Sequence, residues 1–341
     1  MSDFFACAFG IGTKNRVGEW LEVFFAAPVF RPSAEGAKHL GETIGYAGGN
    51  VDIDLDDDAI DRLIAATTDE AQRHCLTAMR GSSRPRVATF LETDTAILTT
   101  PEAYLKLHLL SHRFAKPNTL NLDNIYATMP NVAWTSQGAI DISEIVERQL
   151  EARARGELID VTGVDKFPRM VNYVVPSGVR IADASRVRLG AYLGEGSTVM
   201  HEGFLNFNAG AMGPNMIEGR ISQGVTIDSG TDLGGGASTM GTLSGGGNIV
   251  ITVGKDCLIG ANSGCGIPLG DRCTIESGLY ITAGTLVQVL DEHRNFVKVV
   301  KARELAGQSD MLFIRNSQTG AVECRTNRKA IQLNESLHSH N

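Results

Sequence analysis

Aliphatic residues recur at every sixth position over a long stretch in the second half of the chain. They stand at Ile181, Val187, Leu193, Val199, Leu205, Ile221, Ile227, Leu233, Val253, Ile259, Leu269, Ile275, Ile281 and Val287. Small residues follow four positions later at most of these sites, as at Ala191, Ala209, Ala237 and Ser263. A helix repeats near 3.6 residues and an alternating strand at 2, so neither explains a period of six. The period is typical of a hexapeptide β-helix, in which three hexads form one triangular coil.

A conventional α/β pattern precedes the repeats. Residues 4–11 and 87–91 read as strands, because apolar and β-branched residues dominate both. Helices are predicted after Asp56, with an apolar side that reaches Leu76, and from Thr100, where a proline occupies the first turn. The capping-box spacing that begins at Asp141 predicts a third helix through residue 154. The Gly-Ile-Gly at residues 10–12 is too short for a dinucleotide fingerprint, and we interpret it as a turn.

These patterns divide the chain into four parts. We expect an α/β domain over residues 1–116 and a helical connector over 117–177. The β-helix should cover residues 178–290, and a short C-terminal extension should cover 291–341, with strands near 296–300 and 311–314. The composition fits such a solenoid, because its many turns need the 38 glycines that the chain contains.

Charge and composition narrow the class of protein. The 31 basic and 39 acidic residues give a net charge of −8, which disfavours nucleic acid and anionic membranes as general partners. No apolar run approaches the length of a membrane span or a signal sequence, so a cytoplasmic protein is expected. Six cysteines do not make a disulfide framework in a chain of 341 residues. Cys257, Cys265 and Cys273 fall within the repeats, where we interpret them as inert buried thiols.

The repeat is interrupted twice, and function should be sought at the interruptions because a regular wall offers no pocket. The first lies between Leu205 and Ile221 and carries Glu218 and Arg220. The second lies between Leu233 and Val253 and is rich in glycine. Taken alone, Glu218 reads as a solvated turn residue. The glycine tract reads as a flexible loop, since it lacks the Lys-Ser/Thr of a phosphate-binding loop.

Longer motifs around these interruptions resemble one family. They are MHEGF at residues 200–204, NFNAG at 206–210, EGRIS at 218–222, GGGAS at 234–238, MGTLSGG at 240–246, GANSG at 260–264, KAREL at 301–305 and RNS at 315–317. Together they resemble the tetrahydrodipicolinate N-succinyltransferases, and in particular the branch found in actinobacteria and some proteobacteria. The resemblance covers about 140 residues and is more specific than a general hexapeptide signature.

The resemblance implies an activity and an assembly. Family members move the succinyl group of succinyl-CoA to the amino group of ring-opened tetrahydrodipicolinate, a step of lysine and diaminopimelate synthesis. They are homotrimers of left-handed β-helices with active sites between neighbouring subunits. An acetyl-CoA-dependent N-acetyltransferase is the alternative, because only the contacts to the succinyl end distinguish the two. A γ-type carbonic anhydrase would need three zinc-binding histidines, and the repeats contain only His201. A non-enzymatic scaffold would not need Glu218, Arg220 and a glycine loop at its interruptions.

The same resemblance assigns roles to residues. Glu218 matches the catalytic carboxylate and would act either as a nucleophile that forms an acyl anhydride or as a general base. Gly241 would offer its backbone N–H to the oxyanion of the thioester carbonyl. Arg220 could pair with the free carboxylate of the succinyl group, and Ser238 could add a hydroxyl donor.

Two further sites are expected from the family pattern. The coenzyme would run past Gly235, Ala261, Glu276, Ser277, Gly284, Lys301, Arg315, Asn316 and Ser317. Lys301 and Arg315 would supply positive charge for its phosphates. Magnesium would bind on the trimer axis through Glu202, although Ser185 stands where the pattern has a second acid.

Overall fold

The computed structural model describes residues 4–241 and 249–326. Part of the glycine-rich motif at 240–246 therefore lies outside the described residues. The chain forms two compact units. We call them the N-terminal unit (residues 4–109, 119–168 and 172–174) and the solenoid unit (residues 110–118, 169–171, 175–241 and 249–326). No helix of the described chain is long and apolar enough to cross a membrane.

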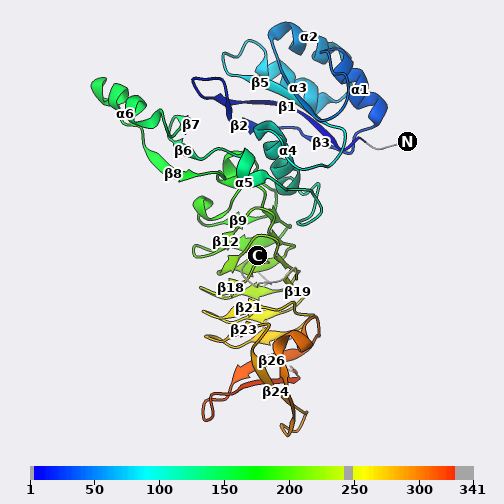
Figure 1. Ribbon diagram of the computed structural model, residues 1–341, viewed down its shortest axis with the longest axis vertical. Coiled ribbons are helices and arrows are strands. Elements are labelled where there is room, and N and C mark those ends of the chain that lie inside the picture. Colours follow the sequence, from blue (N-terminus) through cyan, green and yellow to red (C-terminus); the bar gives the residue numbers. More distant parts are fainter. Residues whose placement is uncertain (1–3, 242–248, 327–341) are drawn as a thin grey trace. The chain divides into compact units, whose positions relative to one another are not determined.

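The N-terminal unit contains two sheets. The first has the strand order β2-β1-β5-β4, with β3 also paired to β1, and the second has the order β7-β6-β8 (Figure 1). The strands are β1 (Ala6–Lys14), β2 (Trp20–Phe24), β3 (Val29–Phe30), β4 (Val51–Asp54), β5 (Arg86–Leu91), β6 (Val132–Thr135), β7 (Gly138–Asp141) and β8 (Val161–Asp165). The helices are α1 (Ala34–Glu42), α2 (Asp57–Ala66), α3 (Glu70–Met79), α4 (Thr100–Ser111), α5 (Ile125–Thr128) and α6 (Ile145–Ala154).

The first sheet packs on α1, α2 and α3 through an aromatic and aliphatic core. Tyr46 stacks on Phe90 with ring centroids 4.8 Å apart, and Ile60, Leu63 and Leu76 are fully buried beside them. Helices as short as α1, α2 and α3 are marginal on their own and need a partner that covers their apolar side. The sheet and the helices therefore stabilise each other.

Four predictions for this region need correction. The glycines at 10–12 lie inside β1 rather than in a turn. Glycine is needed at position 12 because a Cβ there would overlap the carbonyl oxygen of Glu22 on β2. The helix after Asp56 ends at Ala66, and Leu76 belongs to the separate α3. Asp141 makes no capping box; its carboxylate accepts hydrogen bonds from Ser143, and α6 begins at Ile145. The stretch 117–177 is not a purely helical connector, since it forms the sheet β7-β6-β8.

The strands of the repeat region form three parallel walls, and successive strands step from one wall to the next. Wall 1 holds β9 (Arg180–Ile181), β11 (Ser197–Val199), β14 (Asn215–Ile217), β17 (Asp232–Leu233), β20 (Leu258–Ile259) and β22 (Thr274–Ile275). Wall 2 holds β12 (Phe204–Leu205), β15 (Arg220–Ile221), β18 (Ser238–Thr239), β21 (Gly264–Gly266) and β23 (Tyr280–Thr282). Wall 3 holds β10 (Tyr192–Leu193), β13 (Gly210–Ala211), β16 (Thr226–Ile227) and β19 (Thr252–Val253).

This mainly β, three-walled coil confirms the hexapeptide repeat. The aliphatic residues from Val187 to Val287 are buried in its interior, and Ile181 at its first coil is half-buried. Small corner residues such as Ala191 and Ala237 are buried as well. The stack of coils is seen side-on in Figure 1.

A mixed sheet of four strands continues wall 1 at the C-terminal end. Its strands are β24 (Leu286–Leu290), β25 (Phe296–Lys301), β26 (Met311–Arg315) and β27 (Val322–Thr326), in the order β25-β24-β27-β26. The strands β24 and β27 pair in parallel, and the two outer pairs are antiparallel. The first of them to meet the coil is β26, which pairs in parallel with β22. The two strands predicted near 296–300 and 311–314 are thereby confirmed as β25 and β26.

Candidate active site

The first interruption of the repeat is a shortened corner between wall 1 and wall 2. Only Glu218 and Gly219 separate β14 from β15, whereas residues 200–203 and 234–237 fill the same corner in the coils before and after. The walls keep their register despite this, because Ile217 pairs with Leu233 and Arg220 with Ser238. We call Glu218–Gly219 the short corner.

Close backbone packing fixes the short corner. The amide of Glu218 donates to Leu233 O (2.8 Å), and its carbonyl accepts from Gly236 N (3.3 Å). A Cβ on Gly219 would overlap the carbonyl oxygen of Ala237, so only glycine permits this approach. The Glu218 backbone is therefore held, while none of the described residues hydrogen-bonds or ion-pairs with its half-buried carboxylate. A Cβ on Gly235 would lie 3.5 Å from Glu218 Oε2, which places the carboxylate beside that glycine.

Arg220 and Ser238 are neighbours on wall 2. They are paired in register on β15 and β18, about 4.8 Å apart as adjacent strands are. The Arg220 residue is exposed, and no described residue ion-pairs with its guanidinium. Glu218, Arg220, Gly235 and Ser238 thus gather within two successive coils of one chain.

Gly241 is not part of this group. It stands at the opposite corner of wall 2, where a Cβ would lie 3.2 Å from Gln223 O. The register that pairs Arg220 with Ser238 places Gly236 beside Glu218, and Gly241 follows five residues later. At about 3.3 Å per residue for an extended chain, Gly241 lies at most about 16 Å from Gly236 along the wall. Within one chain Glu218 and Gly241 therefore stand at opposite corners of wall 2.

Three positions of the expected coenzyme track form a ladder along the corner between walls 1 and 2. Gly235 accepts from Asn262 N (2.9 Å), and Ala261 accepts from Gly278 N (2.9 Å), so Gly235, Ala261 and Ser277 occupy equivalent places in successive coils. Ala261 and Ser277 are exposed. The ladder begins at the short corner and offers small side chains throughout.

Glu276, Arg315 and Asn316 lie close together, but their polar groups are already engaged. The amide of Arg315 donates to Glu276 Oε2 (2.8 Å), and its guanidinium donates to Gly320 O (3.1 Å). Asn316 donates to Glu323 Oε1 (2.7 Å), and Ser317 follows it in the turn between β26 and β27. The Glu276 carboxylate therefore orients this turn.

Gly284 and Lys301 form a second, separate cluster. Backbone hydrogen bonds join the segments around them, from Ala302 N to Thr285 O (2.8 Å) and from Arg303 N to Ala283 O (3.2 Å). Lys301 lies at the end of β25 and Arg315 at the end of β26, with β24 and β27 between these strands. The two cations are thus three strand spacings apart, about 14 Å, and would meet different phosphates.

Glu202 does not form a metal site within one chain. Its exposed carboxylate lies 3.1 Å from Nδ1 of His201, and Ser185 donates both its N–H and its hydroxyl to Asp183. The bonds from Ser185 lower the pKa of the Asp183 carboxyl. Across residues 4–241 and 249–326 no three histidine, cysteine or acidic side chains come together as metal ligands. A hard cation prefers several oxygen ligands, so a single Glu202 is insufficient.

The interpretation of the repeat-region cysteines as buried free thiols is confirmed. Cys257, Cys265 and Cys273 are buried and unpaired by disulfides. Burial raises the pKa of Cys265 to about 12, which leaves this thiol protonated and unreactive.

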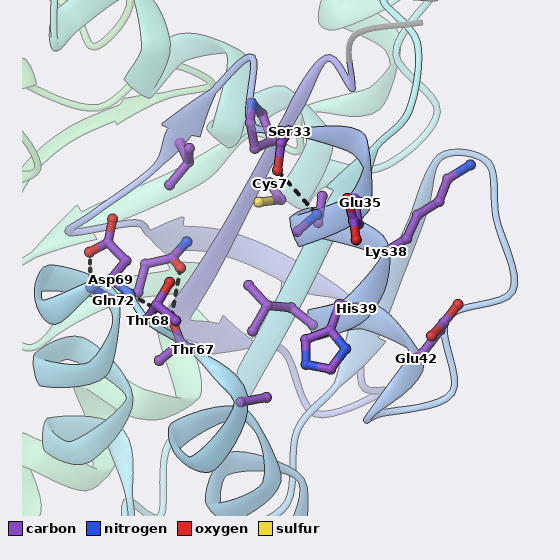
Figure 2. A pocket seen from close by; sticks show the side chains of 16 residues that line it. Cys7, Ser33, Glu35, Lys38, His39, Glu42, Thr67, Thr68, Asp69 and Gln72 are labelled. Atoms are coloured by element: carbon purple, nitrogen blue, oxygen red, sulfur yellow. Dashed lines mark hydrogen bonds between the residues drawn. The ribbon is translucent and has the colours of Figure 1, made fainter. Parts of the chain in front are cut away.

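A cavity of about 1030 Å³ in the N-terminal unit carries none of the predicted site residues (Figure 2). Its polar groups are occupied locally. Ser33 accepts from Gly36 N at the start of α1, Asp69 accepts from Gln72 N at the start of α3, and the Thr67 hydroxyl bonds to Gln72. Figure 2 shows Lys38 projecting from α1 away from this cluster, and it ion-pairs with Glu92 (3.3 Å). This arrangement is typical of helix capping rather than of catalysis.

Sequence reasoning missed two features. The short corner itself was visible only as a break in the period, although the 16 residues from Leu205 to Ile221, in place of 18, indicate a two-residue deletion. The sheet β7-β6-β8 was missed entirely, because its three strands have only four or five residues each and alternate weakly.

Comparison with known proteins adds an independent line of observation. Residues 129–169 match the family model "Tetrahydrodipicolinate N-succinyltransferase middle", and residues 250–283 match "Hexapeptide repeat of succinyl-transferase". The chain is 61% identical over 339 residues to the 2,3,4,5-tetrahydropyridine-2,6-dicarboxylate N-succinyltransferase of Pseudomonas putida, covering 99% of this chain and 98% of that protein. The enzyme of the same name from Vibrio cholerae is 50% identical over 341 residues, with 99% of both chains covered.

A solved structure gives the same result for the fold. A putative 2,3,4,5-tetrahydropyridine-2-carboxylate N-succinyltransferase from Campylobacter jejuni superposes with a TM-score of 0.88 at 29% identity. The match covers 97% of this chain and 94% of that one. The likeness therefore extends well beyond the repeat region, to the N-terminal unit.

Proposed function

The chain belongs to the tetrahydrodipicolinate N-succinyltransferases, and from that premise we propose that the short corner is the place where it transfers the succinyl group. The enzyme uses succinyl-CoA as co-substrate and tetrahydrodipicolinate as acceptor, in the diaminopimelate and lysine pathway. The single observation that carries the location is the Glu218 carboxylate, which is fixed by its backbone yet bonded to none of the described side chains.

Two routes are open to Glu218. As a general base it would take a proton from the acceptor ammonium, and the free amine would attack the thioester carbonyl and expel the coenzyme thiolate. As a nucleophile it would attack the thioester itself, release the thiolate and form a succinyl–glutamyl anhydride, which the amine would then open. Both routes end with one new amide bond, one coenzyme thiol and Glu218 as a carboxylate. Both need the carboxylate within about 3–3.5 Å of its reacting partner.

Arg220 and Ser238 would hold the free carboxylate of the succinyl group. Arg220 projects from the strand that follows Glu218, so the charge lies two residues from the reacting carboxylate. A planar guanidinium binds a carboxylate through two parallel hydrogen bonds, which a terminal acetyl group cannot use. This contact favours succinyl-CoA over acetyl-CoA.

The positions of Glu218 and Gly241 support an assembly. If Gly241 provides the oxyanion donor, we infer that it comes from a second copy of the chain, because Glu218 and Gly241 stand at opposite corners of wall 2 within one chain. We infer a homotrimer of left-handed coils in the cytoplasm, with each site completed by a neighbouring subunit. Light scattering that found a fully active monomer would contradict this assembly. Magnesium would require Glu202 from all three subunits, and no catalytic step depends on it.

The coenzyme would follow the corner ladder. Its pantetheine arm would lie along Gly235, Ala261 and Ser277, where small side chains allow an extended chain to contact the backbone. Arg315 and Lys301 would then meet separate phosphate groups at the C-terminal sheet. The Glu276 carboxylate contributes by holding the Arg315 backbone rather than by touching the coenzyme.

The Glu218→Gln variant tests this assignment. The amide keeps the volume of the side chain but removes its basicity and its nucleophilicity, so turnover with succinyl-CoA should fall at least about a hundredfold. Binding of succinyl-CoA, measured by calorimetry, should be unchanged. Glu195→Gln is the matched control, since Glu195 is exposed at a different corner of the coil. Near-normal turnover of the Glu218 variant would remove the short corner from the mechanism.

The two routes are separated by one further measurement. The native enzyme given succinyl-CoA without acceptor should form a succinyl adduct on the Glu218 peptide, trappable with hydroxylamine, if the anhydride forms. General-base catalysis gives no adduct on that peptide.

A further inference from the structure

A second cavity in the N-terminal unit, of about 310 Å³, lies where β1 and β2 face the sheet β7-β6-β8. Aromatic side chains from both sheets line it, together with one acid and one base: Phe24, Trp134, Tyr173, Glu22 and Arg84. We call it the aromatic cavity. Its volume is at the small end of the range for ligand pockets, which suits a small molecule rather than a coenzyme.

Glu22 presents a carboxylate to this cavity that makes no direct ion pair, although Arg84 lies nearby. Its Oε1 accepts from the Thr13 hydroxyl (2.7 Å), and its Oε2 accepts from the Tyr173 hydroxyl (3.2 Å). No Lys, Arg or His of the described chain lies within ion-pair distance of it. Burial raises the pKa of Glu22, while the hydrogen bonds from Thr13 and Tyr173 and the charge of Arg84 oppose this rise. A charge removed from water is costly unless it is paired, so this carboxylate can accept an ammonium group in direct contact, which the chain itself does not supply.

The walls of the cavity also favour a cation. Trp134 is fixed by a hydrogen bond from its Nε1 to Asp165 O (2.9 Å), and the rings of Phe24 and Tyr173 pack together with centroids 6.4 Å apart. Aromatic faces attract ammonium groups, most strongly where water is excluded. Neutral apolar molecules would leave the Glu22 carboxylate unpaired.

Arg84 adds a place for an anion next to the cation site. Its Nη1 donates to the Thr13 hydroxyl (2.8 Å), the same group that donates to Glu22. The guanidinium and the carboxylate are therefore at most two hydrogen-bond lengths apart, yet they do not ion-pair. A molecule whose ammonium and carboxylate groups are joined through one carbon atom can bridge such a pair.

We propose that the aromatic cavity binds a free α-amino acid, with the ammonium group on Glu22, the carboxylate on Arg84 and the side chain against the aromatic walls. This site lies in the N-terminal unit and takes no part in the succinyl transfer proposed for the short corner. It gives the enzyme a second small-molecule site.

Three probes of similar size test the proposal on the full-length protein by calorimetry. L-Norleucine carries both charges, pentylamine carries only the ammonium group, and hexanoate carries only the carboxylate. We expect binding to fall in that order, with hexanoate not detected. Glu22→Gln should weaken norleucine and pentylamine about ten- to a hundredfold, because a charged hydrogen bond is lost. Glu19→Gln, an exposed neighbour on the same hairpin, is the control.

Two further variants keep the outcome decisive. Arg84→Gln changes an exposed residue and should weaken norleucine to the level of pentylamine while leaving pentylamine unchanged. Glu218→Gln should bind norleucine as the native chain does. No binding of norleucine at 10 mM, or binding that is lost in Glu218→Gln and kept in Glu22→Gln, would overturn the proposal. The second result would assign the amino acid to the acceptor site instead.

Discussion

Replacing Gly235 by alanine should slow catalysis at the short corner without destabilising the fold. The added methyl group would lie 3.5 Å from Glu218 Oε2, an ordinary van der Waals contact. The backbone φ of Gly235 lies outside the left-handed region, so alanine adopts it without strain. The structure therefore tolerates the substitution while the reacting carboxylate gains a methyl group as neighbour.

The substitution should stabilise the fold but slow the reaction. Gly→Ala at a compatible position stabilises a protein by about 0.4–1 kcal/mol, because the unfolded chain loses conformational freedom. A methyl group in contact with Oε2 occupies space that an acyl carbon or an ammonium group needs, and a displacement of about 1 Å costs about a hundredfold in rate. That loss corresponds to about 2.7 kcal/mol in the activation free energy.

The assay is kcat/KM for succinyl-CoA and acceptor, measured beside the thermal unfolding midpoint. Gly163→Ala is the control, since a Cβ there meets no atom within 4 Å and the residue lies far along the chain on β8. The expected result is an unchanged or raised midpoint together with the loss of rate. Native kcat/KM in Gly235→Ala would refute the placement of the thioester beside Glu218, whatever the effect on stability.

Three other substitutions test separate parts of the argument. Arg220→Lys should weaken the use of succinyl-CoA about ten- to a hundredfold and leave acetyl-CoA almost unaffected, and equal losses for both thioesters would deny the contact to the succinyl carboxylate. Gly219→Ala should destabilise the fold by about 1–3 kcal/mol in urea unfolding, because its methyl group overlaps the Ala237 carbonyl; native stability would show that the corner is looser than described. Burial raises the pKa of Glu22 above its ordinary 4.5, so the folded chain holds this proton more tightly than the unfolded chain. The free energy of unfolding therefore falls as the pH rises from the ordinary pKa through the raised one. Glu22→Gln should therefore raise the unfolding midpoint at pH 8 relative to the native chain and have little effect at pH 4, and equal shifts at both pH values would contradict the role of burial.

The repeat could be predicted from the sequence because each coil depends on its nearest neighbours. A period of six fixes which residues face inward, and the register of the walls then follows, including the pair Arg220 and Ser238. The packing of α4 could not be predicted in the same way. The sequence predicts a helix there, but it gives no sign that the charged residues Glu102 and Lys106 are buried. Lys106 pairs with Glu102 in the same helix (3.7 Å) and, more closely, with Asp94 outside it (2.9 Å), and these partners permit its burial.

The candidate site likewise has features that local sequence patterns can predict and features that they cannot. Glu218, Arg220, Gly235 and Ser238 lie in one coil or in adjacent coils, where short-range register decides their positions. The bond between Glu276 and Arg315 joins residues far apart in the chain, and no local pattern predicts it. The placement of Gly241 also depends on corner geometry, because this residue follows β18 at the end of wall 2 opposite Glu218.

The mixed sheet at the end of wall 1 limits how far the solenoid can grow. A stack of parallel coils ends in a strand with unpaired backbone groups, onto which another molecule could add and so begin a fibre. Here β26 occupies that edge and β27 reverses the strand direction. The outermost strand, β25, carries Lys298 and Lys301, whose charges oppose further pairing. The chain itself therefore sets the length of the solenoid. The repeat could continue without limit, but the C-terminal sheet ends it and keeps the fold a discrete molecule.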